Sequence, residues 1–155
     1  MRCRRSSGIR SAALITLAAG LTLAGCGFGS PAATPFSVSY PAATAGANPI
    51  PLTLVDQTGL VTSVVAVAGG AASTGVEVAP GVGSALRVGW QGGPCDDRVT
   101  LVLNDIGSSY ELAIHNHPPI SAGLTCDDSI VTRAVDITFN RHLDPSQLTL
   151  NVTYP

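Results

Sequence analysis

The sequence predicts an all-β domain, an antiparallel β-sandwich of about seven or eight strands, behind an N-terminal targeting segment and a linker. Three observations support this prediction. Apolar and polar residues alternate with a period of two in segment after segment, as in half-buried strands of antiparallel sheets. Turn signals such as Gly69-Gly70 and Pro80-Gly81 separate the segments. Beyond the targeting segment, no stretch has a sustained helical period.

The predicted strands follow one another from residue 52 to the end of the chain. The first three are short apolar segments at 52–56, 60–68 and 76–79. Five later segments alternate clearly, and their apolar positions form the expected core face: Leu86, Val88 and Trp90; Val99, Leu101 and Leu103; Tyr110, Leu112 and Ile114; Val135, Ile137 and Phe139; and Leu148, Leu150 and Val152. We therefore expect the sandwich to cover residues 48–155.

Residues 1–25 have the pattern of a secretory signal. Four arginines lie in the first ten residues, an uncharged apolar stretch follows, and small residues precede Cys26. The apolar stretch is shorter than the roughly 20 residues that a membrane-spanning helix needs. The string Leu23-Ala24-Gly25-Cys26 resembles the lipobox of bacterial lipoproteins. This resemblance implies that Cys26 is lipidated, becomes the first residue of the mature protein and anchors it to the extracytoplasmic face of the cell membrane, since two or more acyl chains give stable anchoring.

Composition adds a linker and excludes one class of partner. Residues 26–47 are rich in Gly, Pro, Ala, Ser and Thr, which predicts that a flexible linker follows the lipidated cysteine. The mature part holds four arginines against ten acidic residues and has no lysine, so its formal charge is −6. Nucleic-acid binding needs clustered Lys and Arg, so we expect no nucleic-acid partner. No motif indicates a cofactor.

Two further strings carry resemblances. Ile137-Thr138-Phe139, followed by Leu143-Asp144-Pro145, is similar to the last strands of several bacterial Ig-like domains. This resemblance implies that the sandwich is Ig-like. It departs from antibody-type domains, in which a tryptophan lies between the two bridged cysteines, because Trp90 precedes both Cys95 and Cys126. The string 90–96 resembles exported actinobacterial proteins. This resemblance implies no catalytic or ligand-binding role for any residue of the string.

Cysteine usage predicts one disulfide. Cys3 leaves with the signal and Cys26 is expected to be lipidated, so Cys95 and Cys126 remain. An exported protein sits in an oxidising compartment, where such a pair is expected to form a disulfide. The bridge would close a loop of about thirty residues and contribute on the order of 3–4 kcal/mol in the chain-entropy model.

The tripeptide Cys-Asp-Asp occurs twice, at 95–97 and 126–128, so a disulfide would gather four carboxylates. One interpretation is a site for a hard cation such as Ca²⁺, which takes several oxygen ligands. The other is a pair of turns whose aspartates bond backbone N–H groups, with Arg98 and Arg133 balancing the charge. Arg133 shares the parity of Val135, so we expect its stem at the rim of the core and its head beside the carboxylates.

Three histidines form the other candidate site. His115 and His117 are two residues apart and therefore face the same side of the predicted strand. Such a pair can bind Zn²⁺ or Cu²⁺, with His142 as a third ligand if its loop lies near. The alternative is a pair of exposed histidines before the turn at Pro118-Pro119.

Together these observations favour a non-enzymatic binding or structural module of the cell envelope. We expect its contact regions at 91–97 and 118–128, since the disulfide would hold both, and an envelope protein as its partner. Metal handling, through the histidines or the Cys-Asp-Asp clusters, is the alternative. An enzyme is third, because the chain has no Gly-x-Ser-x-Gly and no Ser-x-x-Lys motif and both internal cysteines are expected to be oxidised.

Overall fold

A computed structural model describes residues 33–41, 49–119 and 129–154. In these ranges the chain forms one short 3-10 helix and nine strands: β1 (Thr34–Tyr40), β2 (Ile50–Asp56), β3 (Val61–Ala66), β4 (Gly75–Val78), β5 (Ala85–Gly92), β6 (Arg98–Asp105), β7 (Tyr110–His117), β8 (Val131–Phe139), η1 (Pro145–Gln147) and β9 (Leu148–Thr153). The eight segments predicted as strands correspond to β2 to β9, and the all-β class is confirmed. No helix within the described ranges is long and apolar enough to cross a membrane.

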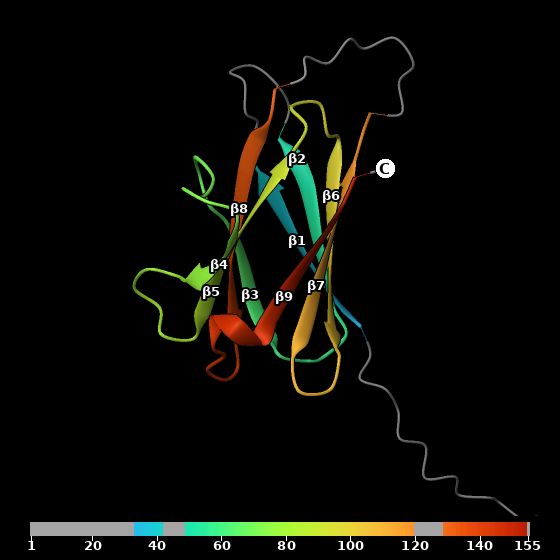
Figure 1. Cartoon of the computed structure of the whole chain (residues 1–155). Helices are drawn as coiled ribbons and strands as arrows, with labels where there is room; N and C mark the ends of the chain where they lie inside the picture. Colours follow the sequence, from blue (N-terminus) through green and yellow to red (C-terminus); the bar gives the residue numbers. More distant parts are fainter. Residues whose placement is uncertain (1–32, 42–48, 120–128, 155) are drawn as a thin grey trace, which may run out of the picture.

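The strands form two sheets that pack face to face (Figure 1). One has the order β1-β2-β6-β7-β9 and the other the order β3-β8-β5-β4. Five of the seven strand pairs are antiparallel, whereas β2 pairs with β6 and β7 pairs with β9 in parallel. The sandwich is therefore mixed rather than purely antiparallel. Alternation shows that a strand is half-buried but does not show which neighbour it pairs with. The two parallel pairs could therefore not be predicted from alternation.

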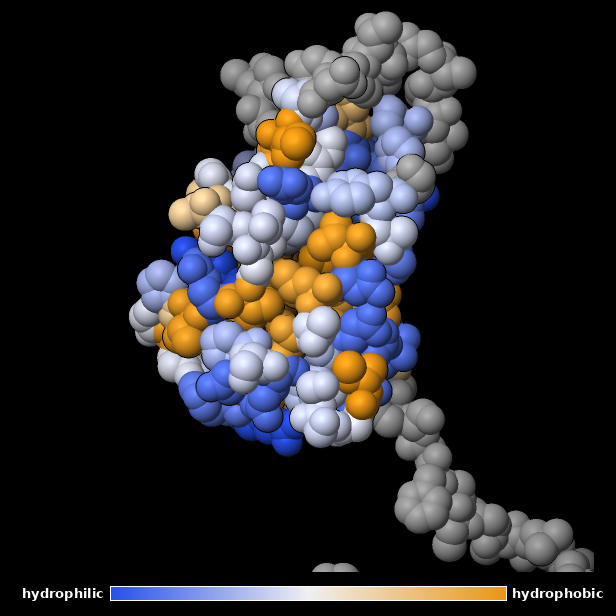
Figure 2. Space-filling view, in the orientation of Figure 1, coloured by the Kyte–Doolittle hydropathy of each residue, from blue (hydrophilic) through white to orange (hydrophobic). Residues whose placement is uncertain are grey.

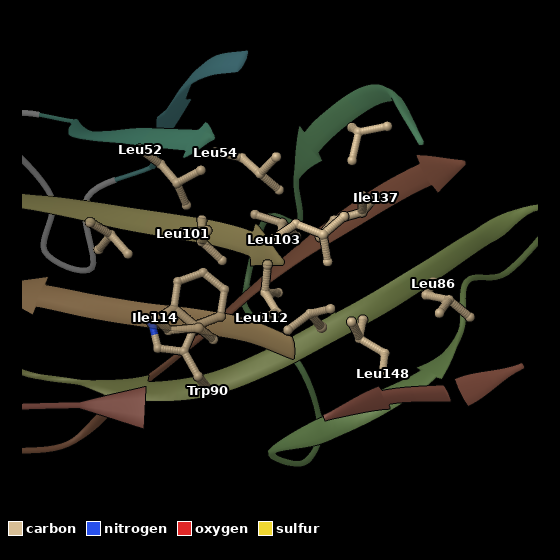
Figure 3. Packing of buried hydrophobic residues seen from close by; sticks show 14 of the residues in the cluster. Leu52, Leu54, Leu86, Trp90, Leu101, Leu103, Leu112, Ile114, Ile137 and Leu148 are labelled. Atoms are coloured by element: carbon tan, nitrogen blue, oxygen red, sulfur yellow. The ribbon is translucent and has the colours of Figure 1, made fainter. Parts of the chain in front are cut away.

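The core lies between the sheets, where the predicted apolar faces meet (Figure 3). In β2, β6 and β7 every second side chain is buried, because successive residues of a strand face opposite sides. The largest fully buried residues are Trp90, Arg133, Leu52, Leu54, Leu86, Leu101, Leu103, Leu112, Ile114 and Ile137. All but one of these are apolar, so the exception needs an explanation, which the site below provides.

Strand β1 corrects the predicted domain boundary. Residues 34–40 fall within the range 26–47 that composition assigns to a flexible linker, yet they form an edge strand paired with β2. Phe36 and Val38 pack against the core, and Tyr40 is buried. The Tyr40 hydroxyl donates to the Val67 carbonyl and accepts from the Ala134 N–H, each at 3.1 Å, and so ties the two sheets together. The alternating string Phe-Ser-Val-Ser-Tyr was the available signal, hidden by the Gly, Pro and Ala around it.

The strand register gives the sandwich two distinct ends. Thr34 pairs with Asp56 at the end that carries the β6–β7 hairpin loop and η1. The opposite end carries the connection from β5 to β6, which contains Cys95, together with the last residues of β7 and the first of β8. We call this opposite end the Cys95 end. The start of β1 and the predicted contact loop at 91–97 thus lie at opposite ends of the sandwich (Figure 1).

Candidate binding surface at the Cys95 end

A buried ion pair organises the Cys95 end. Arg133 of β8 is fully buried opposite Trp90 of β5. Its guanidinium Nη1 lies 2.7 Å from Asp96 Oδ2, and its Nη2 donates to the Gly93 carbonyl at 2.6 Å. The Asp96 side chain is 9% exposed, so water screens this pair weakly. The prediction that Arg133 places its head beside the acidic residues is confirmed.

Two glycines make room for this ion pair. A Cβ at Gly92 would overlap Arg133 Nη1, and it would lie 2.7 Å from Asp96 Oδ2. A Cβ at Gly93 would lie 3.2 Å from Asp96 Oδ1. The Gly93 N–H also donates to Asp96 Oδ2 at 2.9 Å, which closes the turn on itself. The glycines are therefore needed for the close approach of a guanidinium and a carboxylate to the backbone.

Asn116 links the two sheets next to the ion pair. Its Oδ1 accepts from the Trp90 indole Nε1 at 3.2 Å, and its Nδ2 donates to the Gln91 carbonyl at 3.3 Å. The Gln91 carbonyl also accepts from the Tyr154 hydroxyl at 2.9 Å. Asn116 is buried because it has the parity of Leu112 and Ile114. Sequence reasoning overlooked it, although that parity was visible.

Two buried polar atoms remain without a hydrogen-bond partner in the described part of the chain. They are Arg133 Nε and Asp97 Oδ1. Nearly all buried polar groups in folded proteins are satisfied by protein or by ordered water. The Cys95 end therefore has hydrogen-bonding capacity that the described side chains do not use.

A hollow lies beside the ion pair. It has a volume of about 400 Å³ and is lined by Gln91, Gly92, Gly93, Ser129, Ile130 and Tyr154. Ile130 and Tyr154 are 68% and 57% exposed. A second hollow of about 320 Å³ shares Gln91 and Tyr154 with the first and runs between β9 and the pair β4–β5. Figure 2 shows hydrophobic surface on this face of the molecule, which we call the β9 seam. Its half-buried apolar residues are Val76, Leu150 and Val152, and the buried Trp90 lines the same hollow as Leu150 and Val152.

The three histidines do not come together. His115 and His117 are half-buried on the outward side of β7, and His117 Nε2 lies 3.2 Å from Thr100 Oγ1. His142 lies near the other end of the sandwich, where its Nδ1 is 2.9 Å from the Gly83 carbonyl oxygen. The two ends are about 20 Å apart along β7, at roughly 3.3 Å per residue. Within the described residues, no group of three or more His, Cys, Asp or Glu side chains is placed to hold a metal ion.

Other predicted site residues fall outside the described ranges. These are Cys26 with the signal segment, and Cys126 with Asp127 and Asp128. The lipidation, the Cys95–Cys126 disulfide and the gathering of four carboxylates therefore stay predictions. Arg98 is exposed, and the ion pair described at this end is made by Arg133.

Comparisons of the chain with protein-family models, with curated proteins and with solved structures find no match.

Proposed function

We propose that this chain is a lipoprotein anchored through Cys26 to the extracytoplasmic face of the cell membrane. Its sandwich serves there as a non-enzymatic binding or structural module of the cell envelope, and the Cys95 end is its contact surface. The observation that carries the proposal is the buried Arg133–Asp96 pair, which fixes the turn at 93–96 beside a hollow with two exposed apolar side chains.

The physical argument concerns the cost of ordering a surface. Binding is weakened when a loop must be ordered on contact, and a loop already held in one conformation avoids that cost. The turn at 93–96 is held by Arg133 from β8 and by its own hydrogen bonds. A Cys95–Cys126 disulfide, which is part of this proposal, adds a covalent constraint to the same turn.

The exposed side chains indicate what kind of contact the surface makes. Ile130 and Tyr154 stand at the rim of the hollow, and tyrosines are enriched where interfaces concentrate their binding energy. The charge of the turn is balanced by Arg133. The surface therefore suits an apolar segment of a partner protein that carries hydrogen-bonding groups at its edge.

Photo-crosslinking in native membranes tests the proposal. A photoreactive amino acid at position 130 or 154 of the full chain should crosslink to an envelope protein, and the same residue at the exposed position 62 of β3 should not. Crosslinks equally frequent at all three positions, or none at 130 and 154, would contradict the assignment of this end as the contact surface.

Intact mass tests the anchor separately. The natively expressed protein should have the mass of residues 26–155 plus acyl chains, and the mass should rise by about two protons on reduction, as expected for one disulfide. A mass without lipid would remove the membrane anchor from the proposal. A mass unchanged by reduction would remove the disulfide.

The alternative of metal handling by three histidines is not carried forward, because His142 lies at the opposite end of the sandwich from His115 and His117. Metal handling by the two Cys-Asp-Asp clusters stays a prediction, since residues 126–128 lie outside the described ranges.

A further inference from the structure

The edge of β9 is open and uncharged. β9 (Leu148–Thr153) pairs in parallel with β7 on one side, and no strand in the described ranges pairs with its other side. Thr149, Asn151 and Thr153 are exposed. The strand has no charged residue, no proline and no register shift in its pairing with β7. An edge of this kind is a template for pairing with another strand.

The other three edge strands each carry a feature that discourages such pairing. β1 has Pro35, which lacks an N–H to donate. β3 has an irregular register between Val61 and Ser63. β4 is four residues long and carries Glu77. Short strands, prolines, bulges and charges are the usual means by which edges are protected. Within the described part of the sandwich, β9 is the edge without such protection.

We infer that β9 pairs antiparallel with β9 of a second copy of this chain. A register with Asn151 on the two-fold axis places Thr149 opposite Thr153 and Leu150 opposite Val152. This register keeps the polar face of one strand beside the polar face of the other, which a shift by one residue would destroy. No like charges stand opposite each other, and such pairs would be destabilising.

Charge does not oppose a second copy, although the chain is acidic. The nearest carboxylate is Glu111 on β7, whose Oε1 accepts from Asn151 Nδ2 at 2.8 Å. Across the joined sheets the two β7 strands are separated by three strand spacings, about 14 Å. This exceeds the screening length of roughly 8–10 Å at physiological salt. The acidic residues therefore do not prevent the pairing.

The β9 seam adds apolar contact. Leu150 and Val152 are only half-buried, and they line the hollow that runs between β9 and the pair β4–β5. The second copy brings its own Leu150 and Val152 to the same face of the continuous sheet, so each copy extends the apolar surface of the other (Figure 2). One strand pair is small beside a standard interface of about 1,600 Å², so the dimer is weak and depends on concentration. It does not depend on lipidation.

Disulfide trapping tests the pairing directly. Residues opposite each other in an antiparallel pair have Cα atoms about 4.5–5.5 Å apart, which is within the range that a disulfide spans. The full chain with Asn151→Cys should form a disulfide-linked dimer in native membranes under mild oxidation. Ser37→Cys, equally exposed but on β1, is the matched control and should not. Equal trapping of both variants, or of neither, overturns the inference.

A charge variant tests the same contact without crosslinking. Asn151→Asp changes one exposed side chain for another of nearly the same shape, and it places two carboxylates at the two-fold axis, beside those of the two Glu111 side chains. Light scattering of the full chain in detergent should show the mass rising toward that of a dimer with concentration for the wild type and for Ser37→Asp, and staying monomeric for Asn151→Asp. Dimerisation of Asn151→Asp to the same extent as wild type, with an unchanged thermal midpoint, would refute the inference.

The outcomes separate this inference from the proposed function. Crosslinking of position 154 to an envelope protein without self-trapping at position 151 would leave the proposed function standing and remove the dimer. Self-trapping at 151 without a crosslink from 130 or 154 to another protein would do the reverse.

Discussion

Removing the carboxylate of Asp96 should destabilise the domain more than removing its partner Arg133. In Asp96→Ala the guanidinium stays fully buried without a counter-charge. Leaving a buried charge unpaired costs about 3–5 kcal/mol. In Arg133→Met the Asp96 carboxylate also loses its counter-charge, but it keeps the Gly93 N–H at 2.9 Å and is 9% exposed, whereas the Arg133 side chain is 1% exposed. The Gly93 carbonyl loses its partner as well. We expect about 1–3 kcal/mol for that change.

The double variant isolates the interaction itself. Asp96→Ala with Arg133→Met removes both charges at once, so its cost should fall short of the sum of the single costs by about 1–3 kcal/mol. Urea unfolding in oxidising buffer measures these free energies. Trp90 is the one tryptophan of the chain, and it is buried beside Arg133, so its fluorescence reports on this region.

An additive double variant would refute this reasoning. So would a cost below about 1 kcal/mol for Asp96→Ala, which is the range of solvent-exposed ion pairs. Either result would mean that the guanidinium reaches water in solution and that the turn at 93–96 is not held by it.

Three further predictions concern the same fold. Gly92→Ala should lower the free energy of unfolding by about 1–3 kcal/mol through overpacking, because the added methyl group overlaps the guanidinium of Arg133. Urea unfolding measures this change. Gly93→Ala is the control and should lower it less, because its methyl group would lie 3.2 Å from Asp96 Oδ1. Asn116→Ala should cost about 1–3 kcal/mol and shift the tryptophan emission, because it removes the partner of a buried indole N–H; no change in emission would contradict the cross-sheet link. The hydroxyl and the backbone N–H of Ser146 hold the pKa of Asp144 below its ordinary value. The ionised carboxylate therefore stabilises the fold fully at a pH above the unfolded pKa of about 3.9. This stabilisation is lost as the pH falls through the lower pKa of the folded state. Thermal unfolding in that acid range should therefore depend less on pH in Asp144→Asn than in wild type.

Much of the fold follows from alternation alone. The core positions of β5 to β9 were predicted because a half-buried strand places an apolar residue at every second position. The same parity predicted that Arg133 lies at the core with its head beside the acidic turn, as observed. Parity also marks Asn116 as an inward position, but parity alone does not show that its amide reaches the Trp90 indole in the other sheet.

Other features depend on contacts between distant segments, which a single sequence does not report. The parallel pairing of β2 with β6 joins residues about fifty positions apart. The role of Gly92 becomes visible only when Arg133, which lies 41 residues later, is placed against it. β1 was missed for a different reason: its alternation was present, but the surrounding composition of small residues and prolines outweighed it.

In the lipoprotein proposed above, the position at which β1 begins limits the reach of the domain from the membrane. Between Cys26 and Thr34 the chain has seven residues, and the eight steps from one Cα to the next span at most about 29 Å when fully extended. The sandwich adds about 20 Å to the Cys95 end, so the proposed contact surface would stay within about 5 nm of the bilayer. A linker that continued to residue 47 would have allowed about twice that reach. A lipoprotein of this build would therefore meet partners that are themselves close to the membrane surface, because seven residues set its range.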